Sequence, residues 1–440
     1  MTGGTGSDPY VPGHGDDAYD VEHYAIDLDY RPGSNLLQGV AAIDVIAAQQ
    51  LQRLGLDLAG LRVRATWIDG AVVRHRHTGA RLTIELPAPV AAGTRLRVRV
   101  EYRGNPKPLR MRHFGEAGWE ELADGVIVAA QPHGAPTWFP CNDRASSKAT
   151  YDLAVRVPNG YAVAASGAET SRERRGAATT WRFAQRAPMA PYLATVQIGR
   201  YREVAQAARV PMRVLRPATI GGAAFDASFG LQPAMLACFE AEFGPYPFDD
   251  YTAVITDDRL EIPLESQSLS TFGRNHCSPT WNSVRLIAHE LSHQWFGNAV
   301  TVASWRDIWL HEGFACYSEW VWSEASGGPS IDARADEHHA HLAMLPQDLV
   351  LADPGPADMF DDRVYKRGAL ALVALRRTIG AEAMRVLLRT WVATHRGGTV
   401  STADFLDLVG HLHGPEARAL LVPWLELPAL PALPRVRPVQ

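Results

Sequence analysis

Hydrophobic and polar residues alternate with a period of two through much of the first 205 residues. Between residues 24 and 30, and again between 96 and 103, apolar side chains are separated by small or charged ones. Comparable runs at 81–86, 149–157, 179–183 and 193–201 are separated by Gly, Pro or Asn. Strands at this density, with no ten-residue helical pattern among them, predict an antiparallel β domain over residues 1–205.

The pattern changes near residue 206. Two more strand-like runs, at 210–215 and 251–255, precede segments in which apolar residues recur with the helical period. We expect helices over about 278–297, 308–325, 364–379, 381–395 and 401–412. Gly380 suits a helix end and Ser401 or Thr402 a helix start. The chain is therefore expected to be a multidomain α+β protein whose second, mostly helical domain spans 206–440.

The end of the second domain is rich in proline. Prolines recur from Pro423 onward, which predicts an extended tail without helix over about 423–440.

Composition narrows the class of protein. The chain of 440 residues is 46% hydrophobic and 21% charged, as expected of a globular protein with a sizeable core. Its net charge is −5 and no basic block is present, which argues against a nucleic-acid partner or a membrane surface. The amino terminus has no positive n-region and no apolar h-region, and no stretch approaches 18 apolar residues, so we expect no secretory leader, no membrane span and a cytoplasmic location. The four cysteines lack metal-ligand spacing and are expected to be free thiols.

Candidate chemistry is concentrated in the segment His289-Glu290-Leu291-Ser292-His293. Residues i and i+4 of a helix lie on one face, so both imidazoles can reach a single ion, and Glu290 can act on a water bound to it. Zinc suits two neutral imidazoles and, with a third protein ligand, keeps a fourth position open for water. Glu312, which follows after 18 intervening residues, supplies that ligand if the two helices form a hairpin. Two surface histidines beside a solvated glutamate are the simpler alternative for the motif alone.

These motifs resemble those of a known enzyme family. HELSHQWFGN at 289–298 and WLHEGFA at 309–315, with the interval between them, are similar to the gluzincin zinc aminopeptidases, the family of aminopeptidase N and leukotriene hydrolase. Residues 138–143 and 365–368 resemble further family segments. The resemblance implies a saddle-like β domain over 1–205 and a thermolysin-like catalytic domain from 206. It also implies a short form that lacks the large C-terminal helical domain of other members.

The resemblance implies a role for each matching residue. Three residues match the ligands of one zinc ion per chain: His289, His293 and Glu312. Glu290 matches the general base, and Tyr365 matches the phenol that donates a hydrogen bond to the oxyanion of the tetrahedral intermediate. Glu319 matches a family glutamate and is a candidate partner for a ligand histidine, with a solvated helix face as the alternative.

Removal of single residues from an amino terminus requires recognition of the free α-amine. Residues 262–266 occupy the place of the family's Gly-x-Met-Glu-Asn, which implies that Glu265 binds the amine with help from Gln131 of the β domain. Ile262 replaces the family glycine and Ser266 the asparagine, which puts the backbone contacts to substrate in question. An ordinary exposed loop glutamate is the alternative for Glu265.

The sequence therefore predicts a zinc-dependent aminopeptidase that hydrolyses amino-terminal residues of peptides through a zinc-activated water. One alternative is a zinc hydrolase with relaxed amine recognition, either an endopeptidase or an epoxide hydrolase. Another is a catalytically silent peptide-binding protein. The expected partners are peptides with a free amino terminus, with neither nucleic acid nor membrane, and no oligomeric state follows from the sequence.

Overall fold

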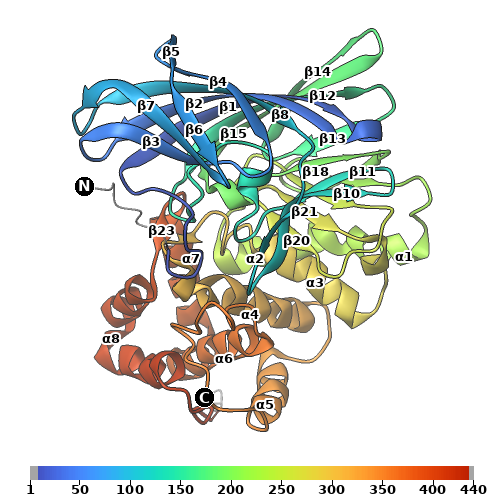
Figure 1. Cartoon of the computed structure of the whole chain (residues 1–440). Helices are drawn as coiled ribbons and strands as arrows, with labels where there is room; N and C mark the ends of the chain where they lie inside the picture. Colours follow the sequence, from blue (N-terminus) through green and yellow to red (C-terminus); the bar gives the residue numbers. More distant parts are fainter. Residues whose placement is uncertain (1–7, 436–440) are drawn as a thin grey trace. The chain divides into compact units, whose positions relative to one another are not determined.

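The structure, a computed structural model, describes residues 8–435, and its internal contacts form two compact units (Figure 1). Unit 1 comprises Met1–Ala205, Arg213–Thr219 and Asp249–Arg274. Unit 2 comprises Gln206–Met212, Ile220–Phe248 and Asn275–Gln440. The contacts therefore assign two segments beyond residue 206 to the β-rich unit, whereas the sequence pattern indicated one boundary.

The largest sheet of unit 1 has eight strands in the order β14-β15-β12-β1-β2-β8-β4-β5. Their bounds are β1 Tyr19–Arg31, β2 Leu36–Ala47, β4 Arg62–Ile68, β5 Ala71–Val73, β8 Arg95–Gly104, β12 Ala149–Pro158, β14 Ala168–Arg175 and β15 Ala178–Met189. Alternation places one face in the core: on β8, Leu96 and Val98 are buried while Arg95 and Arg97 are exposed. The pairs are antiparallel except β1 with β12, which is parallel. That pair joins segments far apart in the chain, as the crossover between parallel strands requires.

Three smaller sheets complete unit 1. Their orders are β13-β16-β11-β10-β9, β17-β18-β19-β21-β20 and β3-β7-β6. The strands of the first are β9 Leu109–Met111, β10 Gly115–Leu122, β11 Gly125–Ala129, β13 Ala162–Ala165 and β16 Val196–Gly199. Those of the second are β17 Arg202–Gln206, β18 Met212–Arg216, β19 Tyr251–Ile255, β20 Leu264–Ser266 and β21 Leu269–Phe272. Those of the third are β3 Leu51–Asp57, β6 His75–Thr78 and β7 Arg81–Val90. The short strand β20 pairs antiparallel with β21 and carries Glu265.

Unit 2 is mostly helical. Its helices are α1 Ala223–Asp226, α2 Gln232–Phe243, α3 Trp281–Ser292, α4 Trp309–Ala325, α5 Ile331–Leu342, α6 Asp362–Ile379, α7 Ala381–His395 and α8 Thr402–Glu426. A two-stranded sheet pairs β22 Thr301–Val302 with β23 Thr399–Val400. An added Cβ on Gly313 of α4 would lie 2.7 Å from the Cα of Gly368 in α6, so these glycines allow the two helices to approach closely. In the described part of the chain, no helix has the length and apolar character needed to cross a membrane.

The predicted helices at 308–325, 364–379 and 381–395 correspond closely to α4, α6 and α7. Helix α3 is shorter than the helix predicted over 278–297, because it ends at Ser292. Three helices, α1, α2 and α5, were not expected. Ser401 caps α8 as predicted, and its hydroxyl and the Asp404 carboxylate form a capping box.

The C-terminal end of α8 corrects the predicted tail. This helix continues past the expected end at 412, with a kink at Gly414, and it contains Pro423. Pro423 removes only the one helical hydrogen bond to the carbonyl four residues earlier, and helix continues after it as far as Glu426. Because the helix ends at Glu426, the carbonyls of Pro423 and Trp424 have no intrahelical donor, and they accept hydrogen bonds from the guanidinium of Arg367. Residues 427–435 are not helical, and 436–440 of the predicted tail lie outside the described residues.

Candidate metal centre and active site

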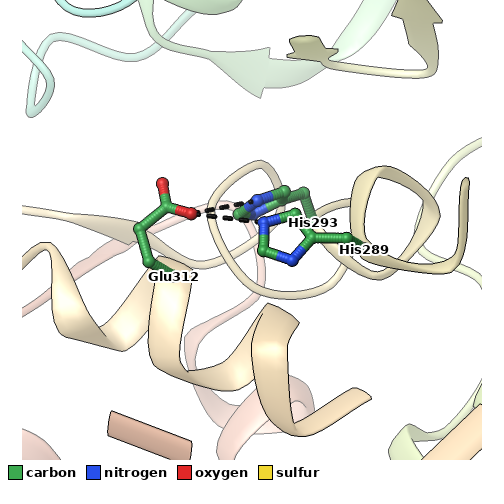
Figure 2. A group of neighbouring side chains, drawn as sticks. All are labelled: His289, His293 and Glu312. Atoms are coloured by element: carbon green, nitrogen blue, oxygen red, sulfur yellow. Dashed lines mark ion pairs between the residues drawn. The ribbon is translucent and has the colours of Figure 1, made fainter. Parts of the chain in front are cut away.

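Helix α3 and the start of α4 bring two imidazoles and one carboxylate together. The Nε2 atoms of His289 and His293 lie 3.4 Å and 3.5 Å from Oε2 of Glu312 (Figure 2). All three residues are buried, at most 6% exposed, and their ligand atoms lie within 4.8 Å of one another. Two nitrogens and one carboxylate oxygen converging in a buried place form the donor set that zinc prefers.

A second hydrogen bond orients each histidine ring. The Nδ1 atom of His293 lies 2.9 Å from the carbonyl oxygen of Phe296, and Nδ1 of His289 lies 2.8 Å from Oε1 of Glu319. A carbonyl oxygen only accepts, so Nδ1 of His293 carries the proton. In a neutral ring, Nε2 then presents its lone pair toward Glu312, as a metal ligand must.

Glu319 is 2% exposed, so a solvated helix face does not describe it. Arg285, one turn before His289 on α3, donates from a single guanidinium nitrogen to both carboxylate oxygens of Glu319, at 3.3 and 3.4 Å. Burial opposes ionisation of Glu319, but Lys366, His289 and Arg285 outweigh it and hold its pKa at about 2. Glu319 is thus a carboxylate at neutral pH and can accept the proton of His289.

The pKa values of the ligand residues show that the site favours positive charge. Burial disfavours a charged His289, but hydrogen bonds to Glu312 and Glu319 raise its pKa to about 9. Burial likewise disfavours a charged Glu312, yet His293 and His289 hold its pKa well below its usual value. Glu312 beside the Nε2 atoms and Glu319 behind His289 therefore add negative charge that favours a divalent cation among the three candidate ligands.

The two predicted catalytic groups belong to the same unit. Glu290 is 4% exposed, and one of its carboxylate oxygens lies within 4.8 Å of a ring nitrogen of His293. Tyr365, in the first turn of α6, is partly exposed, and its ring stacks near that of His289 with centroids 5.9 Å apart and planes at 22°. Unit 2 therefore places a carboxylate and a phenol beside the candidate ligands.

The predicted amine-binding residues meet in unit 1. The Nε2 atom of Gln131 donates to Oε1 of Glu265 at 2.6 Å. Glu265 lies on strand β20 and is 6% exposed, unlike an ordinary loop glutamate, while nearby Glu261 is exposed. A carboxylate only accepts, so the amide nitrogen of Gln131 must face it, and the amide oxygen remains an acceptor.

Sequence reasoning missed Arg285 and Lys366. Arg285 precedes His289 by four residues, so the helical period alone would have placed it on the ligand face. Lys366 is buried and lies 3.4 Å from the Cys316 sulfur, a contact between two helices that no local pattern reveals. His311, beside Glu312 in sequence, accepts a hydrogen bond from the Val302 N–H through Nε2.

Two family models match the chain, one over its β-rich amino-terminal part and one over its mostly helical carboxyl-terminal part. The family model "Peptidase M1 N-terminal domain" matches residues 20–193, and "Peptidase family M1 domain" matches 228–424. A leucyl aminopeptidase of Saccharolobus solfataricus is 22% identical over 93% of this chain and 54% of its own length. Aminopeptidase B of Rattus norvegicus is 26% identical over 75% of this chain and 52% of its own. The chain thus spans about half the length of these relatives.

Solved structures of similar length also match. An M1 zinc metallopeptidase mutant from Deinococcus radiodurans is 34% identical, with a TM-score of 0.89 over 97% of this chain and 99% of that chain. A two-domain M1 zinc metallopeptidase mutant bound to L-arginine is 34% identical, with a TM-score of 0.90 over 98% of this chain and 99% of that chain. A third structure, from D. radiodurans, is bound to the substrate Tyr-Ser-Ala, with a TM-score of 0.89 at 34% identity, over 98% of this chain and 99% of that chain.

Proposed function

The chain belongs to peptidase family M1, and on that premise we propose that it is a zinc-dependent aminopeptidase. The observation that carries the proposal is the buried convergence of His289, His293 and Glu312, with both histidine rings oriented by further hydrogen bonds. These three residues would hold one zinc ion. When bound, the ion supplies a Lewis acid that polarises the scissile carbonyl and increases the acidity of water.

The remaining chemistry is assigned to Glu290 and Tyr365. Glu290 is proposed to take a proton from the attacking water and to pass it to the leaving amine, because it is a carboxylate next to a ligand histidine. Tyr365 is proposed to donate its phenolic hydrogen bond to the oxyanion that develops on the carbonyl oxygen. Its stacking near His289 supports this assignment.

Recognition of the substrate amine is assigned to unit 1. Glu265 supplies a negative charge and Gln131 an acceptor oxygen, and a protonated α-amine requires both kinds of group. We therefore propose peptides with a free amino terminus as substrates. Structures of the related metallopeptidase bound to L-arginine, L-tryptophan and Tyr-Ser-Ala support this class of ligand. A cytoplasmic location is part of the proposal, and cell fractionation tests it.

Turnover of aminoacyl fluorogenic amides, with and without chelator, tests the proposed function. We expect cleavage that chelation abolishes and zinc restores. Acetylation of the substrate amine should abolish it as well. The Glu290→Gln variant should keep its zinc and lose roughly 10²–10⁴-fold in turnover, since an amide cannot accept the proton.

The same assay separates the alternatives. Equal cleavage of acetylated and free peptides would favour an endopeptidase. Saturable peptide binding without turnover by the zinc-loaded protein would favour a silent peptide-binding protein.

A further inference from the structure

The solvent face of the eight-stranded sheet in unit 1 contains a hollow of about 450 Å³. Its walls come from strands β1, β2, β4, β8, β12 and β15, which are adjacent in the sheet (Figure 1). Ligand pockets in proteins have volumes of about 300–1,000 Å³. No residue of this hollow belongs to the candidate metal centre or to the amine-binding pair.

Strand register explains why the sheet is hollowed here. One row across the sheet reads Glu101, Val40, Asp27, Ala154 and Arg182, from β8 to β15. Val40 and Ala154, on either side of Asp27, have short side chains, so the middle of the row forms a low floor. Longer charged side chains stand at both ends of the row and form the rim.

The charges around this floor are not balanced. Arg156 pairs with Asp29 at 2.6 Å, and Glu101 pairs with Arg99 at 2.6 Å. The remaining cations that line the hollow form no ion pair among the described residues: Arg64, Arg103 and Arg182. Asp27 is the remaining acid, so the uncompensated charge is positive in a chain whose net charge is −5.

A β-bulge contributes to the arrangement. The register between β4 and β8 shifts between Val63 and Ala65, and Arg64 is the extra residue. Bulges change the direction of a side chain and are frequent next to binding sites. Arg64 lines the hollow together with Arg103 of the neighbouring strand.

The cations stand on two opposite sides. Arg103 on β8 and Arg182 on β15 are separated by β2, β1 and β12, or four strand spacings, which is about 19 Å at roughly 4.8 Å each. A single small anion cannot contact both sides, whereas an elongated ligand with an anionic group near each end can. Asp27 between them suits an N–H donor in the middle of the ligand.

We propose that this hollow binds a short acidic peptide. Carboxylates near its two ends pair with Arg64 and Arg103 on one side and with Arg182 on the other, where guanidinium groups can bind carboxylates in bidentate fashion. Backbone N–H groups between them face Asp27. A continuous polyphosphate chain fits less well, because Asp27 repels it and no exposed aromatic ring in the lining offers a base-stacking surface.

An acetylated tetrapeptide of D-glutamate, labelled with fluorescein, tests the site by fluorescence anisotropy on the full-length protein. The acetyl group and the D-configuration keep the probe out of a site that acts on free amines of L-peptides, so the result does not depend on the proposed function. We expect saturable binding at low salt that weakens as salt rises, because exposed charges are screened.

The double variant Arg103→Glu/Arg182→Glu should weaken binding at least tenfold. Arg76→Glu, an exposed arginine on β6 in another sheet, is the matched control and should change affinity less than twofold. Circular dichroism and turnover check that the variants fold.

Four results would overturn the proposal. Three of them are the absence of saturable binding at millimolar probe, equal affinity for the D-lysine tetrapeptide, and equal affinity of the double variant. Competition by inorganic phosphate at the same concentrations as unlabelled peptide would also overturn it, in favour of a simple anion site.

Discussion

At the scale of single residues, the candidate metal centre is organised by groups that do not face the ion themselves. Glu319 receives a hydrogen bond from His289 and is held by Arg285, while a backbone carbonyl orients His293. Each contact fixes a ring so that Nε2 points toward Glu312. Metal affinity should therefore depend on residues outside the ligand set.

The first prediction concerns Glu319. Glu319→Gln should weaken zinc binding about 10–100-fold, the range found when such outer partners are removed. Arg285→Met should change affinity in the same direction by a smaller factor, because Glu319 keeps its bond to His289. Competition with a chelating dye measures both, and Glu337→Gln, on α5, is the control. Unchanged affinity in Glu319→Gln would remove this carboxylate from the metal centre.

The phenol of Tyr365 gives the second prediction. Tyr365→Phe removes only the hydroxyl, so transition-state stabilisation should fall while ground-state binding persists. We expect kcat to drop by about 10²–10³-fold with little change in KM, as for the loss of one oxyanion donor. A rise in KM at unchanged kcat would indicate substrate positioning instead.

The amine anchor gives the third prediction. Glu265→Ala should reduce cleavage of free-amine substrates by 10²-fold or more, because the loss of one partner of a buried charge pair costs about 3–5 kcal/mol. Zinc content should stay the same. The control is Glu261→Ala, an exposed neighbour. If that control lost more activity than Glu265→Ala, the anchor would be misassigned.

At the scale of secondary-structure elements, the sequence pattern predicted the features that depend on contacts within a single helix or strand. The helical period placed α4, α6 and α7 closely, and the spacing of His289 and His293 placed both on one helix face. Helix α5 was missed because its sequence, IDARADEHHAHL, has few apolar positions. The burial of Glu319 depends on helix packing, and the parallel pair of β1 and β12 depends on distant segments. Neither feature produces a periodic pattern within one segment of the sequence.

The end of α8 is another feature that a local sequence pattern does not predict. A local rule predicts no helix beyond Pro423, but the guanidinium of Arg367, in a different helix, donates to the carbonyls of Pro423 and Trp424, which have no intrahelical donor in the last turn. It also donates to the carbonyl oxygens of Leu349 and Pro428. Tertiary contacts therefore decide where this helix ends.

Arg367 gives the fourth prediction. Arg367→Met should lower the free energy of unfolding by about 3 kcal/mol or more, because several buried carbonyls lose their donor at once. The midpoint of urea denaturation measures the loss. Arg385→Met, which breaks partly exposed pairs with Glu242 and Glu382, should cost at most about 1 kcal/mol. Equal losses in the two variants would contradict the capping role.

At the scale of the whole molecule, the two compact units separate the proposed tasks. Unit 1 holds Glu265, Gln131 and the hollow, whereas unit 2 holds the residues proposed to bind zinc and carry out hydrolysis. Each unit has its own buried core. A ligand that binds one unit should therefore stabilise that unit first.

Removal of zinc gives the last prediction. At a zinc concentration 1,000 times the dissociation constant, binding stabilises the folded unit 2 by about 4 kcal/mol. For a unit of about 200 residues this corresponds to a shift in Tm of about 8–16 °C. Calorimetry with and without chelator should show one transition that moves by this amount and one that scarcely moves. The Glu312→Ala variant should show the Tm values of the chelated protein, both with and without chelator. If both transitions shifted equally, zinc would stabilise the chain as one cooperative body, and the assignment of separate stability to the two units would be wrong.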